Sequence, residues 1–320
     1  MAYIKKNSVF ISSTGRTGTQ FFGKKISDSI EDCFSVHEPA VVWLSRPKEW
    51  REKSKIFGPF RMTIGQFLPS NSMFKLSADR AAGRIDDDKA REYVYKQRKR
   101  YVSKVKQSLY VESNAHLYGV LDLLSDIFPN CKIVYVIRDP RTWIRSALNT
   151  SEYVLYSPID FRFFKASVRA IDFEDDPYYD KWNRMSKFEK YCWYYNKVNS
   201  YVLSHMSGKE NFKIFRFEDL FQAPNKVSEF QRMLDFATDF CHRKYHYELK
   251  EEMIEKKVHA RAKKGKLPHW REWEPNLSKI ITEHCGRWFR EYDYGKEKEW
   301  REKLKAAGVL LSLDEQLFQL

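Results

Sequence analysis

A glycine-rich run of small and hydroxyl-bearing residues follows an apolar stretch near the start of the sequence, in VFISSTGRTGTQFFGKK. The run comprises Ser13, Thr14, Gly15, Arg16, Thr17, Gly18 and Thr19. Its glycines let a strand-to-helix turn point several backbone N–H groups at one anion, and the hydroxyls and the guanidinium add donors. The run predicts a loop that binds phosphate or sulfate, although an ordinary glycine-rich turn could have the same composition.

This loop differs from that of the P-loop nucleoside triphosphatases, in which the second glycine is followed by Lys and then by Ser or Thr. Here Gly18 is followed by Thr19 and Gln20, so the residues that would reach the terminal phosphate and hold Mg²⁺ are missing. The His and Cys residues do not cluster at metal-ligand spacing, and we expect no metal site. A kinase-like, nucleotide-dependent transferase is disfavoured but stays as an alternative.

A second candidate anion site follows the apolar segment KIVYVI, which ends at Arg138. Asp139 can cap the next helix, Pro140 can be its first residue, and Ser146 lies eight residues after the arginine. A guanidinium at the carboxyl end of a strand and a hydroxyl on the following helix can bind a second phosphate. The alternative is an ion pair between Arg138 and Asp139.

A third basic segment reads RAKKGKLPHW. A glycine inside a run of lysines, with Trp270 behind it, suits a loop that closes over an anion with Lys263, Lys264 and Gly265. The whole chain has a net charge of +14, which favours anionic partners. Nucleic acid is one alternative, but the basic helix YVYKQRKRYVSKVK lies in no recognised nucleic-acid module, and we expect no nucleic-acid binding.

Short apolar stretches alternate with helical patterns along the chain, and these elements must position the residues above. The alternation favours an α/β protein with a central parallel sheet between two helical layers. We expect strands at 8–12, 33–37, 108–112, 132–137 and 212–217 and helices at 17–30, 89–107 and 116–128. Segments near 43–75 and 150–180 show no clear periodicity and are predicted to be loops that face a substrate. We expect one domain over residues 1–320.

The five cysteines are dispersed and odd in number, which favours free thiols in a reducing compartment. No stretch approaches the roughly 18 apolar residues that a membrane helix needs, and the first residues lack a signal-peptide pattern. We therefore expect a cytoplasmic protein without stable membrane insertion.

In their order along the chain, these segments resemble the sulfotransferases that use 3′-phosphoadenosine 5′-phosphosulfate (PAPS). SSTGRTGTQFF is similar to the family's 5′-phosphosulfate loop, in the Arg-containing form of several carbohydrate and bacterial members. VYVIRDPRTWIRSALN is similar to its 3′-phosphate motif, which maps onto Arg138 and Ser146, and KKGKLPHW resembles its Arg-Lys-Gly loop. FRFEDL resembles the segment whose aromatic residue contacts the adenine, here Phe217.

The resemblance, which extends from Val9 to about Tyr294, implies the P-loop-like sulfotransferase fold and transfer of a sulfuryl group from PAPS to an acceptor hydroxyl, with adenosine 3′,5′-bisphosphate as product. It implies that Arg16 stabilises charge on the leaving phosphate. Glycan and heparan-type members carry a catalytic Glu in a position similar to that of Glu38, which favours a carbohydrate or glycoconjugate acceptor. The cytosolic small-molecule members carry a catalytic His similar to His116, and the alternative acceptor is a small non-sugar alcohol or phenol.

Both groups of relatives also carry a lysine where this chain reads Glu112–Asn114. Lys75 could replace that lysine only if its segment folds inward. Since neighbouring strand residues point to opposite faces, we expect that His37 and Glu38 do not face the site together.

Overall fold

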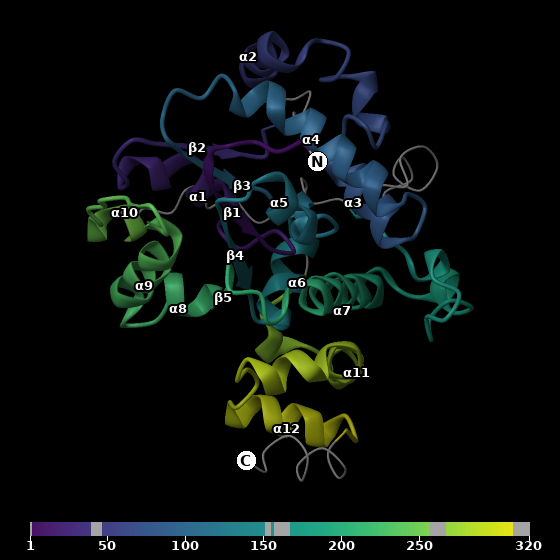
Figure 1. Ribbon diagram of the computed structural model, residues 1–320. Coiled ribbons are helices and arrows are strands. Elements are labelled where there is room, and N and C mark those ends of the chain that lie inside the picture. The colour runs from purple at the N-terminus through teal and green to yellow at the C-terminus, as the bar shows by residue number, and fades with distance from the viewer. Residues whose placement is uncertain (1, 40–46, 151–154, 157–166, 256–266, 310–320) are drawn as a thin grey trace. The chain divides into compact units, whose positions relative to one another are not determined.

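The computed structural model describes residues 2–39, 47–150, 155–156, 167–255 and 267–309 (Figure 1). The chain groups into two compact units, which are described separately. The first comprises Met1–Ile137, Tyr156–Val168 and Ser200–Ala260, and the second comprises Arg138–Leu155, Arg169–Asn199 and Arg261–Leu320. A single domain over 1–320 stays a prediction.

The first unit is built on a five-stranded sheet with the strand order β2-β3-β1-β4-β5. The strands are β1 (Asn7–Ser12), β2 (Cys33–His37), β3 (Leu109–Ser113), β4 (Cys131–Ile137) and β5 (Phe212–Arg216). All neighbouring pairs are parallel, which confirms the predicted α/β class, and each strand bound lies within one residue of its prediction. The segments that follow β1, β2, β3 and β5 therefore begin at the same edge of the sheet.

One face of this sheet is apolar. It packs against α1 (Thr19–Lys25), α8 (Phe217–Phe221) and α9 (Lys226–Thr238), and its cluster of buried residues includes Val9 and Val111 from the strands. Gly23 lets α1 approach β2 closely, because a Cβ atom there would lie 2.5 Å from the backbone of His37.

The opposite face packs against α4 (Asp87–Val102) and α5 (Leu121–Ile127), which completes the three layers. Phe10 and Tyr110 contribute rings to this face, but it also buries an ion pair. Nη2 of Arg98 lies 2.6 Å from Oε1 of Glu112, and both side chains are fully buried.

All three predicted helices are shorter than expected. The helix expected over 89–107 is α4, which begins two residues earlier and ends at Val102. The helix expected over 17–30 is α1 followed by a 3₁₀ turn at Ile26–Asp28. The helix expected over 116–128 is a 3₁₀ turn at Ala115–Leu117 followed by α5. Gly119 lies between these two pieces. A Cβ atom there would be 2.3 Å from the carbonyl oxygen of Ser77, so the backbone of α3 passes close to the chain where the helix is interrupted.

The prediction of a loop near 43–75 is wrong. The described part of this segment contains α2 (Pro47–Phe57), a 3₁₀ turn at Ile64–Phe67 and the start of α3 (Met73–Ala81). In 150–180, the described residues contain one 3₁₀ turn, Ala170–Asp172. The first unit also contains β6 (Asp239–Phe240), β7 (Arg243–Lys244) and α10 (Glu251–Glu255).

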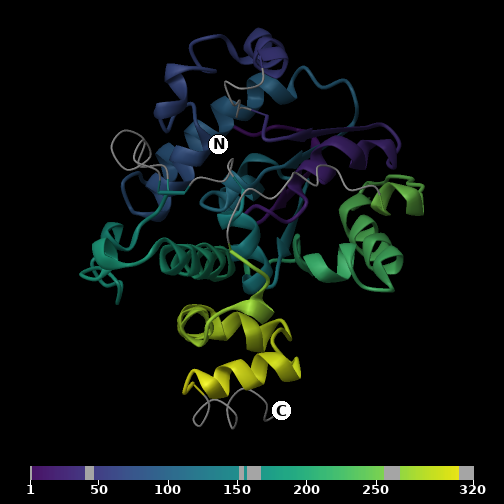
Figure 2. The same cartoon turned by 180° about the vertical axis from the view of Figure 1, so that it is seen from behind.

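The second unit contains α6 (Pro140–Leu148), most of α7 (Lys187–Met206), the 3₁₀ turns Trp182–Arg184 and Trp270–Glu272, α11 (Pro275–Glu291) and α12 (Lys298–Ala306). Helices α11 and α12, yellow in Figures 1 and 2, lie side by side. As predicted, Asp139 caps α6 by accepting a hydrogen bond from the backbone N–H of Arg141 (2.8 Å), and Pro140 is the first helical residue. No described helix combines the length and apolar character needed to cross a membrane.

Candidate functional site

The glycine-rich loop leaves the centre of the sheet after β1 and has an unusual backbone. Gly15, Arg16 and Gly18 all have positive φ values, of 83°, 58° and 82°. Backbone N–H groups that converge on one concave side, beside residues of positive φ, are typical of an anion-binding nest. Positive φ values at these three positions suit a tight strand-to-helix turn, and the binding of phosphate or sulfate by this loop stays a prediction.

Buried hydroxyls hold this loop from within. Oγ of Ser13 accepts hydrogen bonds from the backbone N–H of Gly15 (2.9 Å) and from Oγ1 of Thr17 (2.6 Å). The side chains of Ser13, Thr14 and Thr17 are almost wholly buried, whereas Arg16 is half-buried. The hydroxyls of Ser13 and Thr17 thus shape the loop, while their role toward an anion stays a prediction.

Aromatic packing supports the second glycine of the loop. A Cβ atom on Gly18 would lie 3.1 Å from the ring of Phe221, which is the last residue of α8. The first residue of α8 is Phe217, whose ring centroid lies 5.0 Å from that of Phe221. The residue predicted to contact an adenine therefore belongs to the same aromatic cluster as the base of the loop.

Glu38 follows β2 at the same edge of the sheet, and its carboxylate lies between two imidazole rings. Its Oε2 is 3.6 Å from Nε2 of His37, and its Oε1 is 3.6 Å from Nε2 of His116. The expectation that His37 and Glu38 diverge is wrong, because the positive φ of Glu38 (42°) ends the alternation of the strand and turns its side chain toward His37. The side chains of Glu38, His37 and His116 are 15%, 13% and 17% exposed, so each keeps access to solvent.

Strand pairing explains why residues so far apart in the sequence meet. β2 pairs with β3 so that His37 lies opposite Ser113. The backbone N–H of Glu38 then donates to the carbonyl of Ser113 (3.0 Å), and the segment that carries His116 begins one residue later. The two residues that the sequence offered as alternative bases, Glu38 and His116, therefore lie together.

Burial sets the protonation of both imidazoles. It lowers the pKa of His116, and the neighbouring Glu38 carboxylate opposes part of that shift. Burial also lowers the pKa of His37. The Glu38 carboxylate and the contact with the Ser113 carbonyl oppose part of that shift, while the positive charges of Lys53 and Lys24 add to it. Both rings are therefore neutral near pH 7, and each has a nitrogen facing Glu38.

Three groups hold His116 in place. Its backbone N–H donates to Oδ1 of Asn114 (2.9 Å), and its carbonyl accepts a hydrogen bond from Oγ of Ser77 (2.6 Å). The ring of Phe74 lies against the imidazole, with centroids 4.5 Å apart. Phe74 and Ser77 both belong to α3, so the placement of α3 affects the placement of His116.

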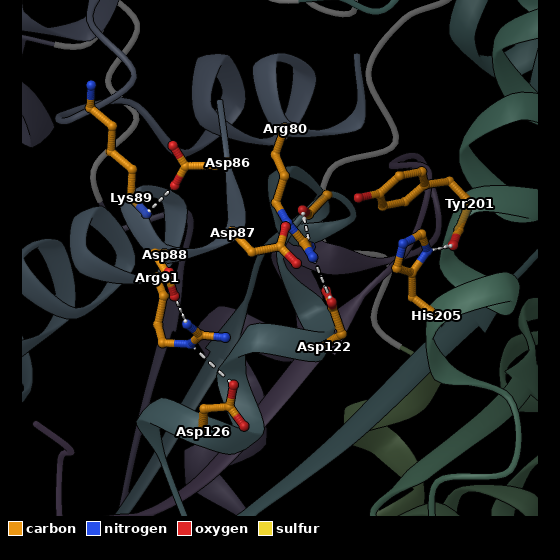
Figure 3. A network of polar contacts seen from close by, with 11 residues as sticks. Arg80, Asp86, Asp87, Asp88, Lys89, Arg91, Asp122, Asp126, Tyr201 and His205 are labelled. Carbon is orange, nitrogen blue, oxygen red and sulfur yellow. Dashed lines mark hydrogen bonds and ion pairs between the residues drawn. The ribbon is translucent and has the colours of Figure 1, made fainter. Parts of the chain in front are cut away.

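Helix α3 is itself anchored by Arg80 (Figure 3). The guanidinium of Arg80 donates to both carboxylate oxygens of Asp122 (2.6 and 2.7 Å), to Asp87 (2.8 Å) and to the carbonyl of Gly119 (2.9 Å). This arrangement ties α3 to α4, to α5 and to the segment between His116 and α5.

A lysine that the sequence did not single out lies next to Glu38. Nζ of Lys53, on α2, donates to the carbonyl oxygen of Glu38 (3.0 Å). Lys75, the candidate replacement for the missing family lysine, forms an ion pair with Asp79 on its own helix instead. Nothing in the local sequence KEWREKSK distinguishes Lys53 from its neighbours, since its position depends on how α2 packs.

The predicted second and third anion segments belong to the second unit. Nε of Arg138 donates to Oγ1 of Thr142 (3.0 Å), and Ser146 lies in α6. Asp139, the alternative partner of Arg138, forms an ion pair with Arg141. The predicted residues Lys263, Lys264 and Gly265 lie outside the described residues.

Trp270, which follows that segment, is buried, and its ring centroid lies 4.5 Å from the guanidinium carbon of Arg141. Across the described ranges, no group of three or more His, Cys, Asp or Glu side chains is arranged to hold a metal ion.

Comparison with known proteins gives one family. A family model described as "Sulfotransferase family" matches residues 8–238, more than two thirds of the chain, and the match includes the glycine-rich loop, Glu38 and His116. No curated protein matches the sequence.

Three solved structures are similar at low sequence identity. The sulfotransferase domain from the curacin biosynthetic pathway is 14% identical, with coverage of 97% of this chain and 100% of that one and a TM-score of 0.41. A sulfotransferase from Mycobacterium avium is 12% identical, with coverage of 89% and 77% and a TM-score of 0.45. One from Alicyclobacillus acidocaldarius is 15% identical, with coverage of 93% and 99% and a TM-score of 0.42.

Proposed function

The chain belongs to the sulfotransferase family of sulfate-transferring enzymes, and we propose that it transfers a sulfuryl group from PAPS to an acceptor hydroxyl. The observation that carries this proposal is the Glu38 carboxylate placed 3.6 Å from Nε2 of a neutral, partly buried His116. This pair lies in the same unit and at the same sheet edge as a loop whose backbone suits a phosphosulfate. On this proposal, the unit supplies both the loop that binds the donor and the group that accepts the proton.

The loop would hold the 5′-phosphosulfate of the donor. Backbone N–H groups of the loop would face the anion, and the half-buried Arg16, itself of positive φ, would add a positive charge. The negative charge that develops on the leaving phosphate would be stabilised by donors that need no rearrangement. Loss of one such donor typically costs on the order of 3–4 kcal/mol of transition-state stabilisation.

The Glu38–His116 pair would take the proton of the acceptor. As the acceptor oxygen forms its bond to sulfur, the bond between sulfur and the 5′-phosphate oxygen breaks and the acceptor proton passes to the pair. Nε2 of neutral His116 can accept that proton, and the adjacent carboxylate stabilises the imidazolium that results. Because the two groups face each other, we propose that they act as a unit, whereas the sequence offered them as alternatives.

Further donor contacts are proposed from the sequence motifs alone. Arg138 and Ser146 would bind the 3′-phosphate, Phe217 would contact the adenine, and the loop with Lys263, Lys264 and Gly265 would close over the nucleotide. The Arg-containing loop and the Glu-Pro sequence at Glu38 favour a carbohydrate or glycoconjugate acceptor. The second candidate acceptor, a small non-sugar alcohol or phenol, is supported by the position of His116 beside Glu38.

The test combines three variants with ³⁵S-labelled PAPS and a panel of saccharides, alcohols and phenols. We expect Glu38→Gln and His116→Gln each to lower kcat by about 100-fold or more. Because groups that act as one unit are not additive, the double variant should lose little beyond either single variant. Calorimetry should show unchanged affinity for adenosine 3′,5′-bisphosphate in all three variants.

His205→Gln is the matched control, since this histidine also stacks on an aromatic ring, that of Tyr201. It should retain wild-type turnover. Multiplicative losses in the double variant would contradict the shared role. Absence of adenosine 3′,5′-bisphosphate binding to the wild-type protein, with no transfer to any acceptor, would contradict the proposed function.

A further inference from the structure

The buried ion pair behind β3 connects to His116 through one side chain. Oε1 of Glu112 accepts hydrogen bonds from Nη2 of Arg98 (2.6 Å) and from Nδ2 of Asn114 (2.8 Å). Oε2 of Glu112 accepts from the hydroxyl of Tyr110 (2.8 Å). Both carboxylate oxygens are thus fixed by donors from a helix and from its own strand, and the carboxylate cannot turn without loss of buried hydrogen bonds.

Asn114 uses all its polar groups, and each bond has a defined direction. Its Nδ2 faces a carboxylate, which can only accept, and its Oδ1 faces the backbone N–H of His116, which can only donate. The amide orientation is therefore determined by its partners. The backbone N–H of Asn114 donates to Ile11 (2.9 Å), and its carbonyl accepts from Oγ of Ser12 (3.0 Å).

We propose that Asn114 is a positioning residue that passes the fixed orientation of the Arg98–Glu112 pair to His116 and so sets the distance between His116 and Glu38. This inference rests on the proposed function, because it gives that distance its catalytic meaning. An ion pair of this kind is a weak source of stability, since replacement by apolar residues is often neutral or stabilising. The ion pair contributes to this site by fixing the orientation of the Asn114 side chain. That side chain bonds to Glu112 through Nδ2 and caps the 3₁₀ turn of His116 through Oδ1.

The positioning role of Asn114 can be measured through the titration of the His116 imidazole. Glu38 is the charge that acts on its ring. The other charged groups nearby are paired: Glu112 with Arg98, and Lys75 with Asp79 on α3. Lys53 on α2 and His37 on β2 both contact Glu38. Loss of the Asn114 bond should loosen the turn, hydrate the imidazole and raise its pKa toward its ordinary value of about 6.5.

The experiment compares Asn114→Ala, Asn114→Ser and Asn211→Ala. Asn211 is the matched control, because its amide is also held by partly buried hydrogen bonds. Its Nδ2 donates to Oγ of Ser125 (3.0 Å) and to the carbonyl (3.3 Å) and Sγ (3.4 Å) of Cys131, at the opposite edge of the sheet. The pKa of His116 is read by NMR of ¹³C-labelled histidine, with the resonance assigned by its loss in His116→Gln. Turnover with PAPS and affinity for adenosine 3′,5′-bisphosphate are measured on the same samples.

For Asn114→Ala we expect a raised His116 pKa and a fall in kcat of about 100-fold, as misplacement by about 1 Å can cause. Affinity for adenosine 3′,5′-bisphosphate should not change. Asn114→Ser keeps an oxygen that can cap the turn, so it should recover part of both losses. Asn211→Ala should lose comparable stability and leave His116 pKa and kcat as in the wild type.

The proposal is overturned if the Asn114 variants match Asn211→Ala in His116 pKa and in kcat per folded molecule. If Asn114→Ala does not fold, Asn114→Ser decides between the same two outcomes. If the wild-type protein transfers no sulfuryl group, the proposed function fails, while the NMR titration still shows whether Asn114 governs the environment of His116.

Discussion

The two faces of one parallel sheet support the site by different means. On one face, the rings of Phe21, Phe22, Phe221 and Phe230 pack edge-on or stacked beneath the glycine-rich loop. On the other face, a buried ion pair and an amide support His116. The loop and the imidazole reach the same edge of the sheet. Beneath the loop, whose own hydroxyls bond within it, the support is aromatic packing, whereas beneath the imidazole it is a chain of directed hydrogen bonds.

This difference separates two requirements of the proposed reaction. An anion-binding loop needs a shape, and dense aromatic packing fixes shape without regard to protonation. A proton acceptor must be oriented toward the proton that it takes. That orientation comes from hydrogen bonds, and each of these is lost when one partner is removed. We therefore expect nucleotide binding to tolerate acid, and loss of polar groups outside the loop, better than proton transfer does.

The largest expected effect is that of Glu112→Ala. It leaves the fully buried guanidinium of Arg98 without its counter-charge and should lower the free energy of unfolding by about 3–5 kcal/mol, measured by urea denaturation. The double variant Arg98→Met/Glu112→Met should recover most of that stability. It should not recover the wild-type pKa of His116, because Asn114 has lost the partner of its Nδ2.

Phe230→Ala provides the counterpart on the apolar face. Truncation of this fully buried ring should cost a similar free energy, about 3–5 kcal/mol. The pKa of His116 should stay at its wild-type value in the folded protein. A shift of that pKa equal to the one in Glu112→Ala would show that the two faces do not act separately.

A smaller effect is expected at Arg80. Arg80→Lys removes the two parallel hydrogen bonds to Asp122 and should cost about 2 kcal/mol in thermal or urea unfolding, with a modest loss of kcat through α3. The control is Arg91→Lys, drawn in the same view (Figure 3), because Arg91 pairs with the exposed carboxylates of Asp88 and Asp126. It should cost less than about 1 kcal/mol. Equal costs at both positions would argue against α3 being anchored by Arg80.

Gly18→Ala tests whether aromatic packing on the apolar face supports the glycine-rich loop. A Cβ atom would force φ of 82° on an alanine and press against Phe221, so we expect a cost of about 1–2 kcal/mol. Affinity for adenosine 3′,5′-bisphosphate should fall about tenfold or more by calorimetry, because the N–H groups of the loop move. The His116 pKa should not change, in contrast to the Asn114 variants.

The smallest effect is that of mild acid on stability. His37 and His116 have lowered pKa values in the folded protein, so below about pH 6.5 the unfolded chain binds more protons than the folded one. Their contribution to stability is complete above that pH and is lost as the pH falls, by at most about 1.4 kcal/mol per pH unit for each histidine. His116→Gln should reduce this slope between pH 5 and 7, whereas Phe230→Ala should shift the whole curve without a change of slope.

The strands were predictable because each is a short apolar run that ends at a polar or turn-forming residue. VFIS and KIVYVI are of this kind, and such runs are typical of strands buried on both faces. Helix α3 was not predictable in the same way. It buries Ser77, Asp79 and Arg80, so its buried side carries polar residues and the usual apolar periodicity is missing.

The site was predictable residue by residue, but not as an arrangement. The glycine spacing of the loop indicated its shape, and Glu38 and His116 were each identified as a candidate base. Their proximity depends on the pairing of β2 with β3 and on the positive φ of Glu38, and neither is encoded in a local pattern. Lys53 was missed for the same reason, because only the packing of α2 brings it to Glu38.

The left-handed backbone of Glu38 has a consequence for how this position would respond to selection. Glycine and asparagine adopt that conformation more readily than glutamate does. A library at position 38 sorted only for resistance to heat should therefore enrich Gly and Asn, whereas sorting for product formation should retain the acidic residue. The difference between the two enriched populations would measure how much thermal stability the protein loses by keeping a carboxylate at position 38.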